Sequence, residues 1–231
     1  MMKEILNGVI QRFSKHDKLL ISLFISIGTA ICLLFARVIY SRQLLFITLI
    51  WNLFLAYVPY LISRTMKNNN RLQKPGLLSL SIVFIWLIFF PNAPYILTDL
   101  QHLSYGSGNV PVWYDVILLI WFSFTGLFLG MVSLVLMQEI VRREFGRWFG
   151  WGFVLVVAGL TSIGVYMGRF LRWNSWDILG NPGGLAQFTL YYLINPTPRS
   201  LVFFSLFTPF FLFIYLLLYA FGHLLLERTE R

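Results

Sequence analysis

Long apolar runs alternate with short polar segments along most of the chain. A bilayer core of roughly 30 Å takes about 20 helical residues to cross. Six runs have this length, and we expect each to form a transmembrane helix. They are Leu19–Tyr40, Leu44–Ile62, Leu77–Tyr95, Asp115–Val141, Trp148–Gly168 and Ser200–Leu226. The pattern therefore predicts an all-α polytopic membrane protein, a bundle of about six transmembrane helices.

The composition agrees with a membrane location. Hydrophobic residues make up 58% of the 231 positions and charged residues only 12%, whereas an ordinary soluble domain carries about 25% charged residues. This balance argues against a soluble enzyme and a disordered chain, and the single cysteine argues against a disulfide scaffold. We predict one transmembrane domain over residues 1–231, with short cytoplasmic tails at 1–18 and 227–231.

The distribution of Lys and Arg accounts for the net charge of +9. Thirteen of the 18 basic residues fall in the two tails and in the second and fourth loops between the predicted spans. Cytoplasmic loops are enriched in Lys and Arg, so both termini are predicted to be cytoplasmic and nucleic acid is not needed as a partner. Five arginines fall on the opposite, outer side: Arg37, Arg42, Arg169, Arg172 and Arg199.

Polar side chains gather in two loops that this distribution places on the outer face. In the earlier loop, Pro91 and Pro94 should end or distort the third helix. Thr98 could then cap a short helical turn. In that turn Asp99 and His102, three residues apart, would share one face. The loop therefore predicts a small polar cluster at the outer boundary of the membrane.

The later polar loop follows the fifth span and is about 30 residues long, a length typical of functional loops. Its first part mixes arginine, tryptophan and small polar residues: Arg169, Arg172, Trp173, Asn174, Trp176 and Asp177. Its later part, Leu185–Ile194, is too short to span a bilayer. We expect that part to form an interfacial or re-entrant helix, and we predict that the two structured outer loops fold over one another.

Four segments of the chain have a distinctive sequence: Phe90–Asp99 with His102, Trp113–Asp115, Gly126–Gly130 and Gly168–Asp177, supported by Trp51–Asn52 and Pro59–Tyr60. Together they resemble a bacterial family of multi-spanning membrane proteins, Domain of Unknown Function 1361. The resemblance covers the chain from about residue 45 to 220. It implies a protein of the bacterial cytoplasmic (inner) membrane, and it brings no established activity, cofactor or catalytic residue.

The acidic residues and the histidine of the outer loops have two interpretations. Asp99, His102, Asp115 and Asp177 are candidate catalytic residues, because carboxylates and imidazole transfer protons and bind divalent metals. Alternatively, Asp115 caps its helix, and Asp99 or Asp177 pairs with a loop arginine in a structural network. Their spacing matches no recognised metal motif, so metal and cofactor use stay open.

The arginines and tryptophans of the later loop are candidate substrate-binding residues. Guanidinium groups bind phosphate through paired hydrogen bonds, and indole rings stack on sugars or lie among lipid headgroups. Arg169, Arg172, Trp173, Asn174 and Trp176 would thus suit an anionic lipid or a lipid-linked precursor, with transferase or hydrolase chemistry as an option. The alternatives are an ordinary aromatic belt and a small permease or accessory subunit. Enzyme activity and oligomeric state stay open.

Small residues predict where helices approach one another. Gly126 and Gly130 are four apart in the fourth span, and Gly164 and Gly168 are four apart in the fifth. Small residues at this spacing allow close packing of membrane helices. Asn52 in the second span is expected to hydrogen-bond to another helix.

Glu139 falls near the inner end of the fourth span, too far from Asp115 to share the outer site. Arg142 and Arg143 follow it at helical spacing. We therefore expect Glu139 to form an ion pair with one of these arginines at the cytoplasmic boundary.

Overall fold

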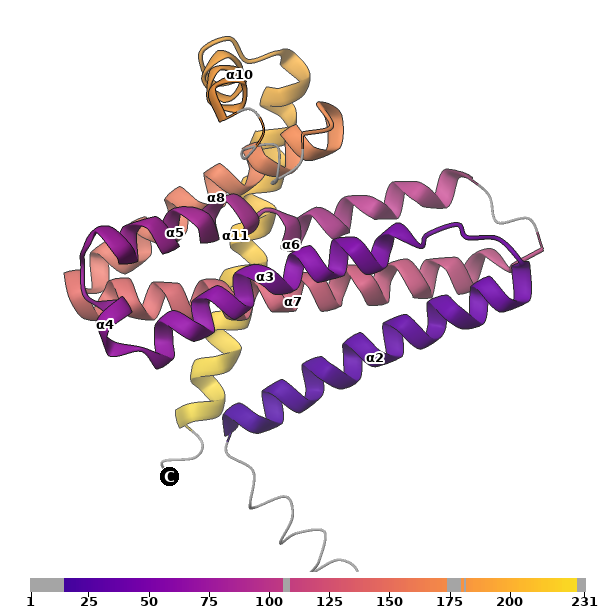
Figure 1. Ribbon diagram of the computed structural model, residues 1–231, viewed down its shortest axis with the longest axis horizontal. Coiled ribbons are helices and arrows are strands. Elements are labelled where there is room, and N and C mark those ends of the chain that lie inside the picture. Colours follow the sequence, from indigo (N-terminus) through magenta and orange to yellow (C-terminus); the bar gives the residue numbers. More distant parts are fainter. Residues whose placement is uncertain (1–14, 106–108, 174–179, 181, 228–231) are drawn as a thin grey trace, which may run out of the picture.

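Every regular element in the described part of the computed structural model is a helix, as predicted. The structure describes residues 15–105, 109–173, 180 and 182–227. The long helices, labelled in Figure 1, are α2 (Lys15–Ser41), α3 (Thr48–Asn68), α5 (Leu77–Phe89), α7 (Val112–Phe145), α8 (Arg147–Phe170) and α11 (Pro198–Glu227). The shorter ones are α4 (Asn70–Gln73), α6 (Asn92–Tyr95), the 3₁₀ helix η1 (Ile96–Tyr105) and α10 (Pro182–Ile194).

Five helical segments in the described ranges are long and apolar enough to cross a membrane. They contain the first, third, fourth and fifth predicted spans and most of the sixth, so the chain is a polytopic membrane protein. The second predicted span is a helix of 21 residues, α3, but it is not among the five. Its apolar character is reduced by Asn52, Pro59 and Arg64 along its length. The number of spans that composition alone supports is therefore five rather than six.

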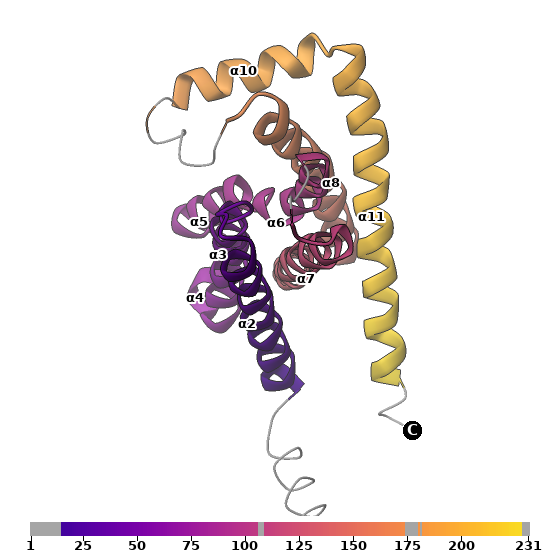
Figure 2. The same cartoon turned by 90° about the vertical axis from the view of Figure 1, so that its right-hand side faces the viewer.

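Helix α7 forms the centre of the molecule. Its most apolar segment is 61% buried, against 17% for the corresponding segments of α2 and α11. One apolar core joins α7 to α5, α8, α11 and the C-terminal part of α3, and a second core joins it to α2, α6 and the rest of α3. Figure 2 shows α2 and α3 on one side of α7 and α11 on the other. Helix α7 thus packs against helices on both sides.

A chain of buried hydrogen bonds links three helices through one hydroxyl. The indole Nε1 of Trp86 in α5 donates to Oγ of Ser133 in α7 at 2.8 Å. The Ser133 hydroxyl in turn donates to the carbonyl oxygen of Pro59, inside α3, at 2.9 Å. Trp86 and Ser133 are fully buried, so these bonds satisfy polar groups that lipid could not.

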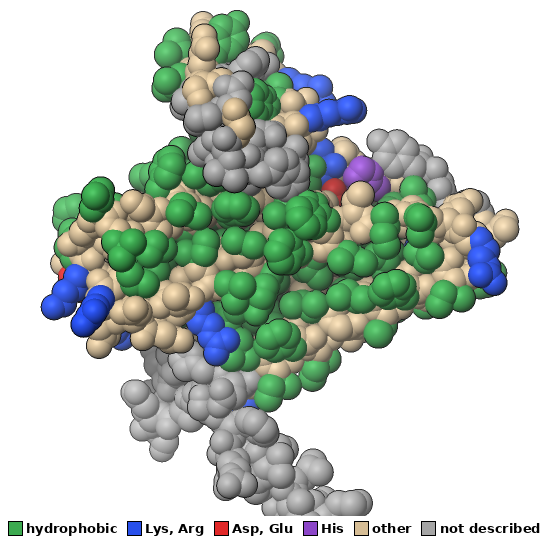
Figure 3. Space-filling view, in the orientation of Figure 1, with side chains coloured by type: hydrophobic (Ala, Val, Ile, Leu, Met, Phe, Trp, Pro, Cys, Tyr) green, Lys and Arg blue, Asp and Glu red, His purple; other side chains and the backbone are tan. Residues whose placement is uncertain are grey.

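Hydrophobic side chains cover the middle of the long helices, and basic side chains appear at both ends (Figure 3). At the C-terminal end of α7, Glu139 pairs with Arg142 at 2.6 Å and with Arg143 at 2.8 Å, which confirms that prediction. Burial and the nearby Arg143 lower the pKa of Lys67 at the end of α3, while Glu139 opposes this effect. The ends of α3 and α7 therefore meet in one basic cluster.

The short helix expected in the later loop is present as α10, which has 13 residues. Figure 2 shows α10 lying across the top of the molecule, above α5 and α8. The hydroxyl of Thr189 in α10 contacts Sδ of Met167 in α8 at 3.4 Å. Helix α10 thus covers the same end of the bundle as the polar loops.

Candidate functional site

The site begins at the break that follows α5. Proline has no N–H to donate, so Pro91 and Pro94 interrupt the helical hydrogen-bond ladder. Instead, the amide nitrogen of Asn92 donates from its side chain to the carbonyl of Phe89 at 2.8 Å. The chain continues as the single turn α6 and then as η1. The predicted helix distortion is confirmed, and it turns the polar residues after Tyr95 toward α8.

Four glycines of α7 and α8 hold this broken segment. A Cβ atom on Gly130 would approach Ala93 Cβ to 2.7 Å, and one on Gly164 would approach Pro91 Cγ to 2.6 Å. Gly126 likewise faces Ile96, and Gly168 faces the ring of Tyr95. The prediction that both glycine pairs lie at helix contacts is confirmed. Each pair contacts the α6 region, so the break is clamped between α7 and α8.

Asp99 of η1 lies at the centre of a buried polar network. Its side chain is 2% exposed and forms an ion pair with Arg169 of α8, which is 7% exposed. The other carboxylate oxygen accepts a hydrogen bond from Asn52 Nδ2 of α3 at 2.8 Å. The two polar loop segments are therefore in direct contact. The predicted link from Asn52 to another helix is also confirmed.

Arg169 is fixed by further contacts besides the ion pair. Its Nε donates to Oγ1 of Thr98 at 2.7 Å, and its Cζ lies 4.3 Å from the ring centroid of Tyr95. The Thr98 hydroxyl donates to the carbonyl of Tyr95 at 2.6 Å. These contacts hold the guanidinium beside α6, in agreement with the structural interpretation of a pair between Asp99 and a loop arginine.

His102 lies at the edge of the network, on the same face of η1 as Asp99. Its Nε2 is 3.4 Å from Oδ1 of Asp99 and 3.4 Å from Nη1 of Arg169. The imidazole is 30% exposed, so the network reaches the surface at this residue. Among the described residues, no three His, Cys, Asp or Glu side chains are grouped in a way that could hold a metal ion.

Asp115 forms a different ion pair, with Arg37 of α2. Arg37 Nε donates to Oδ1 at 2.7 Å and Nη2 donates to Oδ2 at 3.2 Å. Asp115 does not cap α7, because the cap position is Pro111 and no side chain bonds to the helix end. Its carboxylate instead fastens α2 to the N-terminal end of α7.

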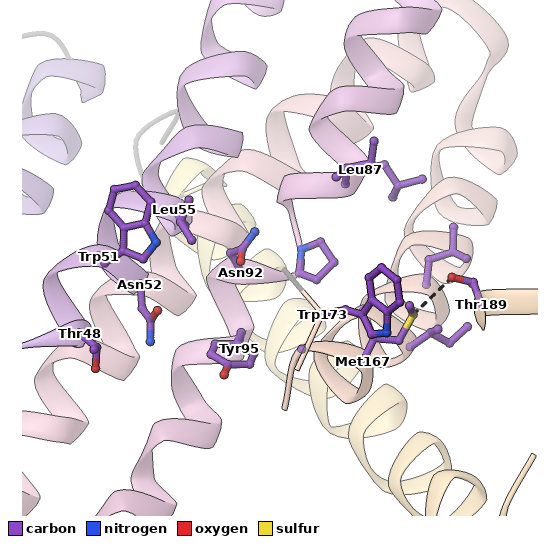
Figure 4. A pocket seen from close by; sticks show the side chains of 16 residues that line it. Thr48, Trp51, Asn52, Leu55, Leu87, Asn92, Tyr95, Met167, Trp173 and Thr189 are labelled. Carbon is purple, nitrogen blue, oxygen red and sulfur yellow. Dashed lines mark hydrogen bonds between the residues drawn. The ribbon is translucent and has the colours of Figure 1, made fainter. Parts of the chain in front are cut away.

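A cavity of about 350 Å³ lies beside the Asp99 network. Figure 4 shows Trp51 and Asn52 of α3 on one side of it and Trp173 on the other, with Asn92 and Tyr95 between them. The remaining walls are mainly apolar residues of α5 and α8, with Gly168 next to Arg169. We call this space the α3–α8 cavity. Its polar lining consists of amide, hydroxyl and indole groups rather than charges.

The structure places only part of the later loop. Trp173 lines the α3–α8 cavity, and Arg172 is exposed, with a positive φ of 58°. Asn174, Trp176 and Asp177 lie outside the described residues. Of the nine candidate residues, the structure brings Asp99, His102 and Arg169 together, with Trp173 on the adjoining cavity.

Sequence reasoning missed several residues of the site. The charge distribution assigns Arg37 only to the outer side and gives it no partner. An arginine near the end of a span requires a counter-charge, and Asp115 at the start of another span can supply one. Trp51, Asn92 and Tyr95 were not proposed as lining residues, although they line the cavity. Asn52 follows Trp51, and Asn92 and Tyr95 each follow a proline, all within apolar runs. Polar groups at this depth of a membrane indicate a candidate binding site.

These features define an integral membrane protein with a polar, helix-broken site against two glycine-bearing helices. The family model for DUF1361, a protein family of unknown function, matches residues 51–216, and the chain belongs to this family. No curated protein and no solved structure matches the chain. The matched range begins within α3 and ends within α11, and it includes the Asp99 network and all described lining residues of the cavity except Thr48.

Proposed function

We propose that the α3–α8 cavity binds a lipid or a lipid-linked precursor. The supporting observation is its lining, in which apolar walls from Leu55, Leu87 and Ile163 meet the amides of Asn52 and Asn92. Ligand sites are typically apolar pockets with a few polar groups that fix orientation. Hydrocarbon would lie against the apolar walls, and hydroxyl or amide groups of the ligand would meet the asparagines.

The charge distribution assigns different roles to the two arginines of the later loop. Arg169 is already neutralised by Asp99, so it positions Tyr95 and the cavity wall. Arg172 is exposed and adjoins Trp173, which lines the cavity. An anionic group on the ligand would therefore meet Arg172. Both oxygens of Asp99 accept bonds, so we assign Asp99 a positioning role.

The proposal places the cavity near the outer face of a bacterial cytoplasmic membrane, with both termini cytoplasmic. The excess of Lys and Arg in the tails and in the second and fourth loops supports this orientation. The resemblance in the polar loops supports the bacterial assignment.

Filling the cavity tests the binding function. Ile163→Trp adds bulk to a cavity wall, and we expect it to remove lipid species that copurify with the native protein in mass spectrometry. Leu78→Trp is the matched control, because Leu78 is 65% exposed on α5 and does not line the cavity. Identical bound species in both variants, with unchanged thermal unfolding, would contradict the proposal.

A permease is the second candidate, because the cavity extends from Trp173 to Asn52. Cysteine labelling separates the two functions. In a Cys32→Ser background, Leu87→Cys would react with an impermeant maleimide from one side of the membrane if the cavity is a binding pocket. Labelling from both sides would favour alternating access and a permease.

A further inference from the structure

A second cavity lies along α11, apart from the α3–α8 cavity. Its volume is about 620 Å³. Its lining residues on α11 are three or four positions apart and so form one stripe: Arg199, Val202, Phe203, Leu206, Phe207 and Phe210. We call this the α11 groove. Val202, Leu206 and Phe210 are 58%, 66% and 48% exposed within a candidate membrane span, so the groove faces lipid.

The length and polarity of the α11 groove match one leaflet of a bilayer. Phe210 lies eleven positions after Arg199, which is about 16 Å of helix. Half of a hydrocarbon core of roughly 30 Å is about 15 Å. Among the described residues that line it, Arg199 alone is charged and stands at one end, and the others are aliphatic or aromatic. A phospholipid has the same arrangement of one charged end and a long apolar chain.

Arg199 is held at the end of the groove by an aromatic ring. Its Cζ lies 4.2 Å from the ring centroid of Phe170 in α8. A guanidinium that stacks by its face keeps its N–H edges for a phosphate. Within the described ranges Arg199 forms no ion pair, whereas Arg37 and Arg169 each have an aspartate.

The start of α11 adds a second positive contribution. Thr197 Oγ1 accepts a hydrogen bond from the backbone N–H of Ser200 at 3.2 Å, so the helix begins beside Arg199. The N-terminal end of a helix carries a partial positive charge that favours anions. Arg199 and this helix end therefore both favour an anion at the same end of the α11 groove.

We propose that the α11 groove binds one anionic phospholipid, with its phosphate at Arg199 and an acyl chain along Val202–Phe210. This site is separate from the α3–α8 cavity, whose polar lining is uncharged. It would anchor α11 to α8 at the level of the headgroups.

Titration of the full-length protein in detergent with phosphatidylglycerol and with phosphatidylcholine, followed by native mass spectrometry, tests the site. We expect phosphatidylglycerol to bind about tenfold more tightly. Both lipids carry a phosphate, but the choline cation of phosphatidylcholine is repelled by Arg199 and by the positive end of α11. Arg199→Gln should abolish this preference, and Arg199→Lys should keep part of it. Arg42→Gln, which removes an exposed arginine that lines neither cavity, should leave the preference intact.

Equal binding of the two lipids would overturn the proposal, as would equal losses in Arg199→Gln and Arg42→Gln. Competition by soluble glycerophosphoglycerol would also overturn it, because that result would show a site for the headgroup alone. Ile163→Trp fills the α3–α8 cavity and should leave the phosphatidylglycerol preference unchanged. Failure of the proposed function and failure of the α11 site are therefore distinguishable.

Discussion

Two buried Arg–Asp ion pairs use the same chemistry in different surroundings. The side chains of Arg37 and Asp115 are 0% and 3% exposed. They join through two hydrogen bonds of 2.7 and 3.2 Å, and Phe46 covers the guanidinium at 4.7 Å. This pair is closed to solvent and lines none of the cavities described above.

The pair of Arg169 and Asp99 is as deeply buried but has open neighbours. Asn52 bonds to Asp99 and lines the α3–α8 cavity, and the partly exposed His102 lies 3.4 Å away. Burial alone therefore does not distinguish the two pairs, but their neighbours do. The pair at Arg37 fastens α2 to α7, whereas the pair at Arg169 contacts Asn52 and Tyr95, which line a cavity.

Removing Asp115 should have the largest effect on stability. Asp115→Ala leaves the guanidinium of Arg37 buried without a counter-charge, which costs about 3–5 kcal/mol in comparable pairs. Thermal and denaturant unfolding in detergent would measure the loss. The double variant Arg37→Met with Asp115→Leu should recover most of it, since an apolar pair leaves no isolated charge. A loss below about 1 kcal/mol in the single variant would contradict a structural role.

Asp99→Asn should cost less stability and change ligand binding. The amide can keep a hydrogen bond to Asn52, but Arg169 loses its counter-charge, so we expect a loss of about 1–3 kcal/mol. Because Asn52 and Tyr95 line the cavity, lipid copurification should also fall. The recovered Arg37→Met, Asp115→Leu protein should keep its lipid. Normal lipid retention in Asp99→Asn would make both ion pairs structural and remove the contrast between them.

Most of the fold could be predicted from the hydrophobic pattern and the charges of the sequence. Apolar runs located the long helices because lipid requires every backbone polar group to be satisfied within a helix. The prolines at 91 and 94 located the break, since their effect on the hydrogen-bond ladder is local. Whether α3 crosses the membrane was harder to predict, because Asn52 and Arg64 lower its hydropathy although the helix packs closely against α7.

The site was predictable only in part, because pairing across the chain is not encoded in local spacing. The separation of three residues predicts that Asp99 and His102 share one helix face, and they do. The partner of Asp115 is Arg37, 78 positions away. Nothing in the sequence near Asp115 distinguishes this partner from the other outer arginines. The cavity is likewise formed by separate helices, and only their packing defines it.

The next prediction concerns the glycines of α7 and α8 that contact the helix break before Asp99. Gly164→Ala would bring a Cβ to 2.6 Å from Pro91, and overpacking of this kind typically costs about 1–3 kcal/mol. Gly159→Ala in the same helix is the control, because nothing lies within 4 Å of its Cβ. That change should be neutral or stabilising by up to about 1 kcal/mol. Equal unfolding temperatures for the two variants would show that the break can shift away from α8.

His102→Ala should have the smallest effect on stability of these variants, and it tests whether the open edge of the Arg169–Asp99 pair contributes to ligand binding. His102 is partly exposed and 3.4 Å from both members of the ion pair, so its removal should change stability by no more than about 0.5 kcal/mol. Thermal unfolding measures this, and native mass spectrometry of the same sample measures lipid retention. Lower retention at unchanged stability would mean that His102 acts on the ligand at the open edge of the network. A loss comparable to that of Asp99→Asn would instead make His102 part of the pair itself, and the cavity wall would then depend on three side chains rather than two.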